Sequence, residues 1–199
     1  MARRITLFHL VVAVFGLAVV NISFTPAATR AETADNFTDP ADQARLDALF
    51  QRLRAPDEGW RLAETEILQI WSRSGSASMD LLLKRGIEAL DAGEIDTALF
   101  HLTALTDHAP GFAEGWAARG AAFAALGEAG PASADLARAL ALEPRHFAAL
   151  TLLCRILDEM EAEDSAEAAC TASLAIHPHQ QEAIDTLARL RHAREGVLL

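Results

Sequence analysis

The stretch GWAARGAAFAALGEAGPASADLARALALEP, residues 115–144, decides the fold. It is rich in alanine, yet a tryptophan, glycines and a terminal proline stand at fixed places in it. Pro110, Pro144 and Pro178 are equally spaced along the chain. Other positions keep the same period: Gly86, Gly120 and Cys154; Ala98, Ala132 and Ala166; Leu102, Leu136 and Cys170. The chain therefore contains a 34-residue repeat.

Each repeat unit is predicted to contain two amphipathic helices. In the first unit, residues 80–90 and 95–107 place apolar side chains at helical spacing. The turn between them, Asp91-Ala92-Gly93, ends in a glycine, which suits a chain leaving a helix in the left-handed conformation. The proline at the end of each unit stops the second helix because it lacks an N–H donor.

This pattern resembles the tetratricopeptide repeat. Trp116, Gly120, Phe123, Ala132 and Pro144 stand in that family's order, with a leucine at position 136 where the family has an aromatic residue. The resemblance implies an all-α fold, a right-handed α-solenoid of helix-turn-helix repeats with helical caps. The three repeats are predicted at residues 79–112, 113–146 and 147–180.

The flanking segments are predicted to be helical as well. Residues 41–73 form an N-terminal helical hairpin, interpreted as a degenerate repeat because Gly59 precedes Gly93 by one repeat length. Residues 181–199 form a C-terminal capping helix with one apolar side. Residues 32–40 are expected to be a disordered N-terminus.

The resemblance also implies a concave groove lined by the first helix of each repeat. Chaperone-adaptor members of the family hold a carboxylate there with lysines and asparagines, but Leu83 and Ile87 stand where polar groups would be needed, so that clamp is not predicted. Lys84 and Arg155 are expected to be isolated cations in an alanine-floored, partly apolar trough. The predicted groove residues are Leu83, Lys84, Ile87, Ala117, Ala118, Ala121, Ala124, Ala125, Thr151, Leu152, Arg155 and Asp158.

The N-terminal segment has the features of an export signal. Arg3 and Arg4 precede an apolar run from Ile5 to Val20, and small residues around Ala31 suit signal peptidase, so residues 1–31 are predicted to be a signal peptide. The alternative is an inner-membrane anchor formed by residues 5–24. After cleavage no membrane association is expected.

The charge balance argues against nucleic acid as a partner. Removing the three arginines of the signal segment from the 17 basic residues leaves 14 basic against 28 acidic side chains, a net charge of −14. Such a chain repels phosphate backbones.

The two cysteines and a histidine pair are the remaining chemical features. Cys154 and Cys170 fall on the two helices of the third repeat, and two interpretations stay open: a disulfide in an oxidising compartment, or two buried free thiols. His177 and His179 flank Pro178 in a loop expected to be exposed, and a metal site is not predicted there because no further ligand is evident. No catalytic residue or cofactor is predicted, because no spacing pairs a nucleophile with a base.

The sequence thus favours a non-catalytic periplasmic scaffold that holds a segment of another envelope protein in its groove. The alternative is a self-associating structural module, in which the N-terminal hairpin forms an exposed end and docks Trp60 and Trp71 onto another copy.

Overall fold

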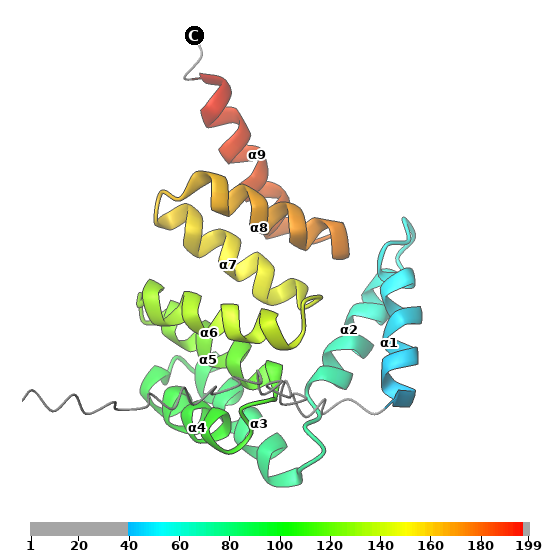
Figure 1. The fold of residues 1–199 in the computed structure, drawn as a ribbon, viewed down its shortest axis with the longest axis vertical. Helices are drawn as coiled ribbons and strands as arrows, with labels where there is room; N and C mark the ends of the chain where they lie inside the picture. Colours follow the sequence, from blue (N-terminus) through cyan, green and yellow to red (C-terminus); the bar gives the residue numbers. More distant parts are fainter. Residues whose placement is uncertain (1–39, 197–199) are drawn as a thin grey trace, which may run out of the picture. The chain divides into compact units, whose positions relative to one another are not determined.

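The computed structural model describes residues 40–196, so the predicted signal segment and residues 32–39 lie outside the described residues. Within this range no helix is long and apolar enough to cross a membrane. The described chain folds entirely into helices, which confirms the all-α repeat fold (Figure 1). The helices are α1 (Pro40–Leu53), α2 (Trp60–Trp71), α3 (Ala77–Asp91), α4 (Ile95–His108), α5 (Ala113–Ala125), α6 (Ala129–Leu142), α7 (Phe147–Glu159), α8 (Glu163–Ile176) and α9 (Gln181–Gly196).

Helices α3 to α8 form three helical hairpins, one for each repeat unit. The second helix of one hairpin packs against the first helix of the next, and α9 packs on α7 and α8 at the end of the array (Figure 1). The turns inside the hairpins share one conformation: Gly93, Gly127 and Glu161, which occupy the same position in successive repeats, have φ angles of +75°, +82° and +59°. Glycine suits this left-handed position, and the third repeat places a glutamate there.

Close approach of the two helices in each hairpin explains the small residues of the repeat. A Cβ atom on Gly86 would lie 2.5 Å from the Leu102 side chain, and one on Gly120 would lie 3.0 Å from the Leu136 Cγ atom. The third repeat holds Cys154 and Cys170 at these same two positions. In the third repeat a pair of cysteines, which the structure joins in a disulfide, therefore replaces the glycine–leucine contact of the first two repeats.

An ion pair between the part-buried Arg119 and the buried Asp135 links three helices in the middle of the array. Arg119 of α5 donates from Nε and Nη2 to the two carboxylate oxygens of Asp135 on α6, at 2.7 and 2.9 Å, and from Nη1 to Thr106 Oγ1 on α4 at 2.7 Å. The hydrogen bond with Asp135 raises the pKa of Arg119. The guanidinium also lies over the Trp116 ring, 4.8 Å from its centroid. Two successive repeats are joined at this point by directional contacts.

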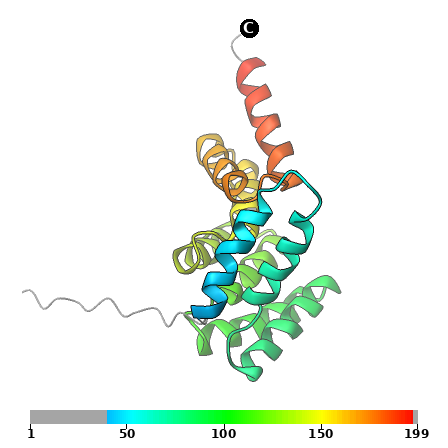
Figure 2. The ribbon, with the colours of Figure 1, turned by 90° about the vertical axis from the view of Figure 1, so that its right-hand side faces the viewer.

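Helices α1 and α2 form a hairpin, but it does not stack on α3 as a preceding repeat would. Its apolar core includes Phe147 from the start of α7 and Ile176 from the end of α8. Figure 2 shows the two helices running antiparallel across the edge of the array. The hairpin therefore does not continue the stacking of the three repeats, and its interpretation as a degenerate repeat stays a prediction. The physical reason for its position is that the hairpin's aromatic side chains find ring partners in the loops before α7 and after α8.

Candidate functional site

The first helices of the repeats, α3, α5 and α7, lie side by side, and α9 continues the row (Figure 1). Three hollows follow this row. One lies on α3, the second lies between α3, α5 and α7, and the third lies between α7 and α9. We refer to these three hollows together as the groove.

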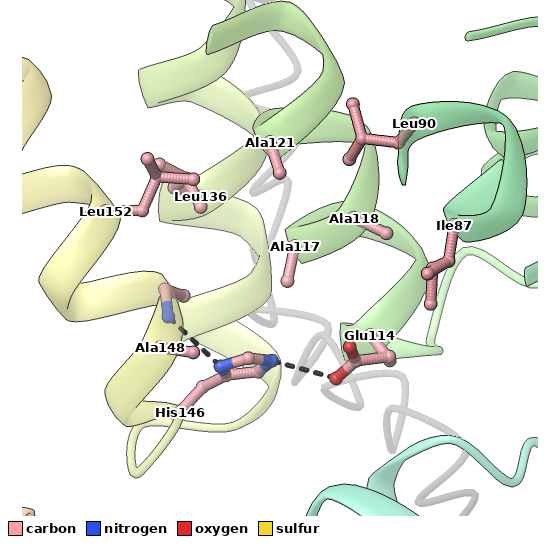
Figure 3. Close-up of a pocket in the computed structure, with 11 residues that line it drawn as sticks. Ile87, Leu90, Glu114, Ala117, Ala118, Ala121, Leu136, His146, Ala148 and Leu152 are labelled. Atoms are coloured by element: carbon pink, nitrogen blue, oxygen red, sulfur yellow. Dashed lines mark hydrogen bonds and ion pairs between the residues drawn. The ribbon is translucent and has the colours of Figure 1, made fainter. Parts of the chain in front are cut away.

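The central hollow has a volume of about 210 Å³ and is mostly apolar. Alanines 117, 118 and 121 of α5 form its floor, and short side chains there leave space that larger ones would fill (Figure 3). Larger apolar residues of the neighbouring helices border it. These are Ile87 and Leu90 from α3, Leu136 from α6 and Leu152 from α7.

A histidine–glutamate pair stands at one end of the central hollow. The His146 ring accepts a hydrogen bond at Nδ1 from the Ala149 N–H, at 3.2 Å, so the proton of the neutral ring is on Nε2. That nitrogen faces the Glu114 Oε2 atom at 3.0 Å (Figure 3). The His146 ring also stacks on Trp71 of the hairpin, with 4.6 Å between the centroids. The hairpin therefore supports one wall of the hollow.

The two outer hollows are polar. The hollow on α3 has a volume of about 430 Å³. It is lined by Asp80, Lys84 and Glu88 of α3 and by Arg73 from the loop between α2 and α3. The one between α7 and α9 has a volume of about 590 Å³. Its lining residues are Arg155, Asp158, Glu159, Glu182, Asp185, Thr186 and Arg189.

Nine of the predicted groove residues line these hollows, and three do not. Thr151 is buried, with its Oγ1 atom 2.7 Å from Ser173 Oγ of α8, so it faces the second helix of its own repeat. Ala124 and Ala125 lie beyond the end of the central hollow. The nine are Leu83, Lys84, Ile87, Ala117, Ala118, Ala121, Leu152, Arg155 and Asp158.

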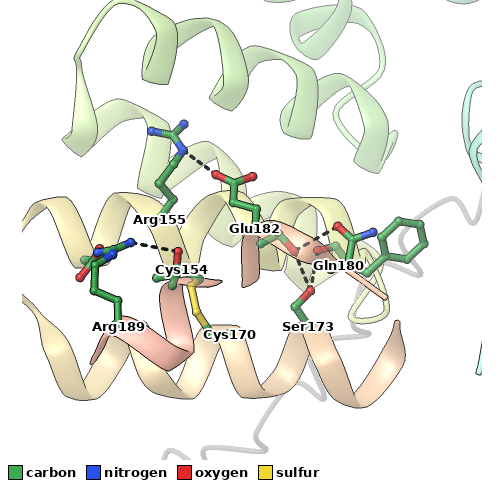
Figure 4. Close-up of a disulfide and its surroundings, with 11 residues drawn as sticks. Cys154, Arg155, Cys170, Ser173, Gln180, Glu182 and Arg189 are labelled. Atoms are coloured by element: carbon green, nitrogen blue, oxygen red, sulfur yellow. Dashed lines mark hydrogen bonds and ion pairs between the residues drawn. A yellow bond between two sulfur atoms is a disulfide. The ribbon is translucent and has the colours of Figure 1, made fainter. Parts of the chain in front are cut away.

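The expectation of isolated cations in the groove is wrong. Lys84 lies 3.8 Å from Glu88, and Arg155 lies 2.6 Å from Glu159 and 3.1 Å from Glu182 of α9 (Figure 4). Lys84–Glu88 and Arg155–Glu159 are i,i+4 pairs within one helix, and the Arg155–Glu182 pair was missed because α9 was treated only as a cap. Sequence reasoning also missed Glu114 and His146, which stand at the start of α5 and just before α7, where the loops meet the groove.

The structure joins Cys154 of α7 to Cys170 of α8 in a disulfide (Figure 4). Their Cα atoms are 5.1 Å apart, within the range that a disulfide spans without backbone movement. Both residues are buried, which fits a structural crosslink in the third repeat.

The His177-Pro178-His179 loop is not the exposed segment that the sequence suggested. His177 is fully buried, with its ring 4.9 Å from that of Phe147 and 5.4 Å from that of Trp60. Its Nε2 atom lies 3.2 Å from the Glu64 Oε1 atom of α2. Burial lowers the pKa of His177, and the Glu64 carboxylate acts in the opposite direction. Within residues 40–196, no group of three or more histidine, cysteine or acidic side chains could hold a metal ion.

The hairpin docks onto two loops at equivalent repeat positions. Arg145, in the loop between α6 and α7, lies 2.6 Å from Asp47 of α1 and over the Phe50 ring. His179, at the same position of the next repeat, stacks on Trp60 at 4.7 Å, and its Nε2 atom lies 3.0 Å from the Ala55 carbonyl oxygen. The loop before α5 has a glycine at the matching position, 111.

The hairpin is therefore not a free end, and Trp71 is not available for docking onto another copy, whereas Trp60 is half-buried and self-association through it stays a prediction. Trp71 is only 7% exposed, and both rings stack within the same chain. The histidines of the loops after α6 and α8 were the sequence signal for this docking.

The geometry defines a helical-repeat protein with an open groove along its first helices. No family model matches the chain. It is 30% identical over 192 residues to a TPR repeat-containing protein of Rhizobium etli, covering 92% of this chain and 94% of that protein. The chain belongs to the tetratricopeptide-repeat family.

Solved structures show the same fold at low sequence identity. The first TPR domain of Spaghetti (RPAP3) has a TM-score of 0.58 at 21% identity, covering 60% of this chain and 95% of that one. The Sgt2 TPR domain of Aspergillus fumigatus has a TM-score of 0.58 at 20% identity, over 61% and 82%. The Yersinia enterocolitica chaperone SycD has a TM-score of 0.57 at 12% identity, over 60% and 96%.

Proposed function

We propose that this protein is a non-catalytic scaffold that holds a segment of another protein in the groove. The observation that carries the proposal is the central hollow, where an alanine floor lies open between larger apolar side chains of α3, α6 and α7. An apolar side chain placed there loses contact with water without displacing any protein side chain, which favours binding.

The similar proteins support this use of the groove. The RPAP3 domain is bound to an HSP90 peptide, and SycD is in complex with a peptide of the translocator YopD. In our proposal the groove is preformed by the repeats, and the partner binds and leaves without any bond being made or broken.

We further propose that the protein works in the periplasm and that its partner belongs to the cell envelope. Support comes from the apolar segment behind Arg3 and Arg4 and from the disulfide, since disulfides persist in oxidising compartments. Cell fractionation with N-terminal sequencing of the protein tests this. A new N-terminus after Ala31 in the periplasmic fraction is expected, and a full-length protein in the cytoplasm would refute it.

A photocrosslinking residue in place of Ala121 tests the scaffold proposal. Ala121 lies in the floor of the central hollow, whereas Ala137 is an exposed alanine on α6 and serves as the matched control. We expect crosslinks from position 121 to one envelope protein, mapped to a single segment of it by mass spectrometry. Equal capture from both positions, or none from 121, would contradict a groove that holds a partner.

A further inference from the structure

Carboxylates outnumber cations along the groove. The two outer hollows are lined by Asp80 and Glu88 on α3, by Asp158 and Glu159 on α7, and by Glu182 and Asp185 on α9. Glu114 stands at the central hollow. The cations that line the hollows are Arg73, Lys84, Arg155 and Arg189.

Each of these four cations is already paired. Arg73 lies 3.4 Å from Asp42, Lys84 lies 3.8 Å from Glu88, and Arg189 contacts Asp158. Arg155 is shared between Glu159 and Glu182. The groove therefore has no spare positive charge in the described chain to attract an acidic segment.

Three of the carboxylates have no such compensation. Within residues 40–196, no lysine or arginine forms an ion pair with Asp80, Glu114 or Asp185. Asp80 accepts hydrogen bonds from the Ser74 N–H and hydroxyl, and Asp185 accepts one from the Gln181 amide. Glu114 faces the Nε2–H of His146. None of these three carboxylates is paired with a lysine or arginine of the described chain, so each can accept an ion pair from a cationic ligand side chain.

Six of the seven carboxylates line the two outer hollows, and Glu114 stands at one end of the apolar hollow between them. Neighbouring packed helices are separated by about 8–10 Å, so the distance from α3 to α7 is about 20 Å. An extended chain covers that distance in about six residues. The apolar centre excludes charged side chains, because burying an unpaired charge there is unfavourable.

We propose that the groove binds an extended segment of another protein whose centre is apolar and whose two ends carry lysine or arginine. This inference rests on the proposed scaffold function and specifies its partner. Charge complementarity of this kind mainly sets specificity and association rate, whereas the apolar centre holds the segment in place. The chain as a whole has a net charge of −11, which adds to the attraction of a basic segment.

Three synthetic peptides of about a dozen residues, long enough to span the groove, test the proposal. The first has leucines in its centre and two arginines at each end, the second has glutamates in place of the arginines, and the third keeps the arginines but has serine for each leucine. Fluorescence anisotropy with the purified protein measures each affinity. We expect the first peptide to bind at least about tenfold more tightly than either of the others, and to weaken as salt is raised. Equal or tighter binding of the glutamate peptide would overturn the proposal.

Two variants of the protein locate the effect in the groove. Glu114→Gln and Asp185→Asn remove one charge each while keeping a hydrogen-bond acceptor, and Glu163→Gln removes an exposed charge on α8 as the control. We expect each groove variant to weaken binding of the arginine peptide about threefold, and the control to leave it unchanged. Equal effects in all three variants would show a non-specific attraction and overturn the proposal. Circular dichroism melts verify that each variant is folded.

The two proposals fail in different ways. If position 121 crosslinks to a mapped segment that lacks basic residues, or if a segment is captured there while the arginine peptide does not bind, the basic-partner inference is wrong and the scaffold function stands. If neither crosslinks nor peptide binding is found, both are wrong.

Discussion

The repeat array and the N-terminal hairpin are stabilised in different ways. In the array, equivalent side chains meet in successive repeats, as in the Gly86–Leu102 and Gly120–Leu136 contacts. The hairpin is attached through rings and charges, with Trp71 stacked on His146 and Arg145 paired with Asp47. Packing in the array is repeated and mostly local, whereas the hairpin depends on contacts between segments far apart in the sequence, such as Arg145 with Asp47.

This difference shows that a segment outside the repeat array can form one side of the groove without being a further repeat. The hairpin binds the loops before α7 and after α8, and it contacts the groove through His146. The hairpin thus supports one edge of the groove through contacts that differ from those between the repeats. Five measurements test these two modes of stabilisation.

Removal of Asp135 is expected to destabilise the array most. Asp135→Ala leaves the largely buried Arg119 guanidinium without its carboxylate partner, which costs about 3–5 kcal/mol. Chemical denaturation measures the free energy of unfolding. The double variant Arg119→Met/Asp135→Leu, which removes both charges, should recover most of the loss. A loss below about 1 kcal/mol in the single variant would contradict a structural role for the pair.

Truncation of Trp71 is expected to release the hairpin while leaving the array folded. Trp71→Ala removes a buried ring that contacts Phe50, His146 and Phe147, at a cost of about 3–5 kcal/mol. Hydrogen exchange should become faster in α1 and α2 and stay slow in α5 and α6. Leu62→Ala, at a side chain 73% exposed on α2, is the control and should change little. Faster exchange in both regions alike would show that hairpin and array unfold as one unit.

Reduction of the disulfide is expected to destabilise the third repeat by about 3 kcal/mol, because the bond joins cysteines at a sequence separation of 16 and closes the loop between them. Unfolding of the protein with and without dithiothreitol measures this. The variant Cys154→Gly/Cys170→Leu restores the residue pair of the first two repeats and should fold with no response to reductant. Equal stability of the wild-type protein in both conditions would refute a contribution from the bond.

Acidification is expected to weaken the attachment of the hairpin. Burial lowers the pKa of His177 below its ordinary value of 6.5, so the unfolded chain takes up the proton at a higher pH than the folded one. The stability is therefore complete above about pH 6.5 and falls as the pH drops toward the folded-state pKa. The protection factors of the α2 amides, which are corrected for the pH dependence of the intrinsic exchange rate, should fall on the acidic side of that pH. His177→Gln should reduce this dependence, and a hairpin that becomes more stable on acidification would contradict it.

The smallest effect is expected at the turn of the third repeat. Glu161 has a φ of +59°, where Gly93 and Gly127 stand in the other repeats. Glu161→Gly should raise the melting temperature slightly, by a gain of about 0.5–1 kcal/mol. Gly127→Ala is the reciprocal change and should cost about 1 kcal/mol. A loss of stability in Glu161→Gly would mean that the glutamate side chain makes a stabilising contact at the turn.

Much of the fold could be predicted from the repeat period, because the repeat is a local pattern. Pro110, Pro144 and Pro178 mark the ends of the units, and the helix boundaries follow from them closely. The part of the groove that is formed by the first helix of each repeat could be predicted from the sequence. Thr151 was misplaced because its hydroxyl finds Ser173, a partner on the next helix that the helical pattern does not reveal.

The docking of the hairpin could not be predicted in this way. Periodicity identifies which side of α2 is apolar, but it does not identify what covers that side. Gly59 matched the repeat period and suggested a degenerate repeat, whereas the rings of Trp60 and Trp71 have their partners in the loops before α7 and after α8.

The sequence alone determined the family, the helical hairpins and the two positions at which the disulfide could form, because these depend on contacts between residues close in the chain. The tertiary structure decided where the N-terminal hairpin lies, which groove charges are paired, and that His177 is buried. These features depend on contacts between distant segments, such as Glu64 with His177 and Arg155 with Glu182, which form only when the array brings the helices together.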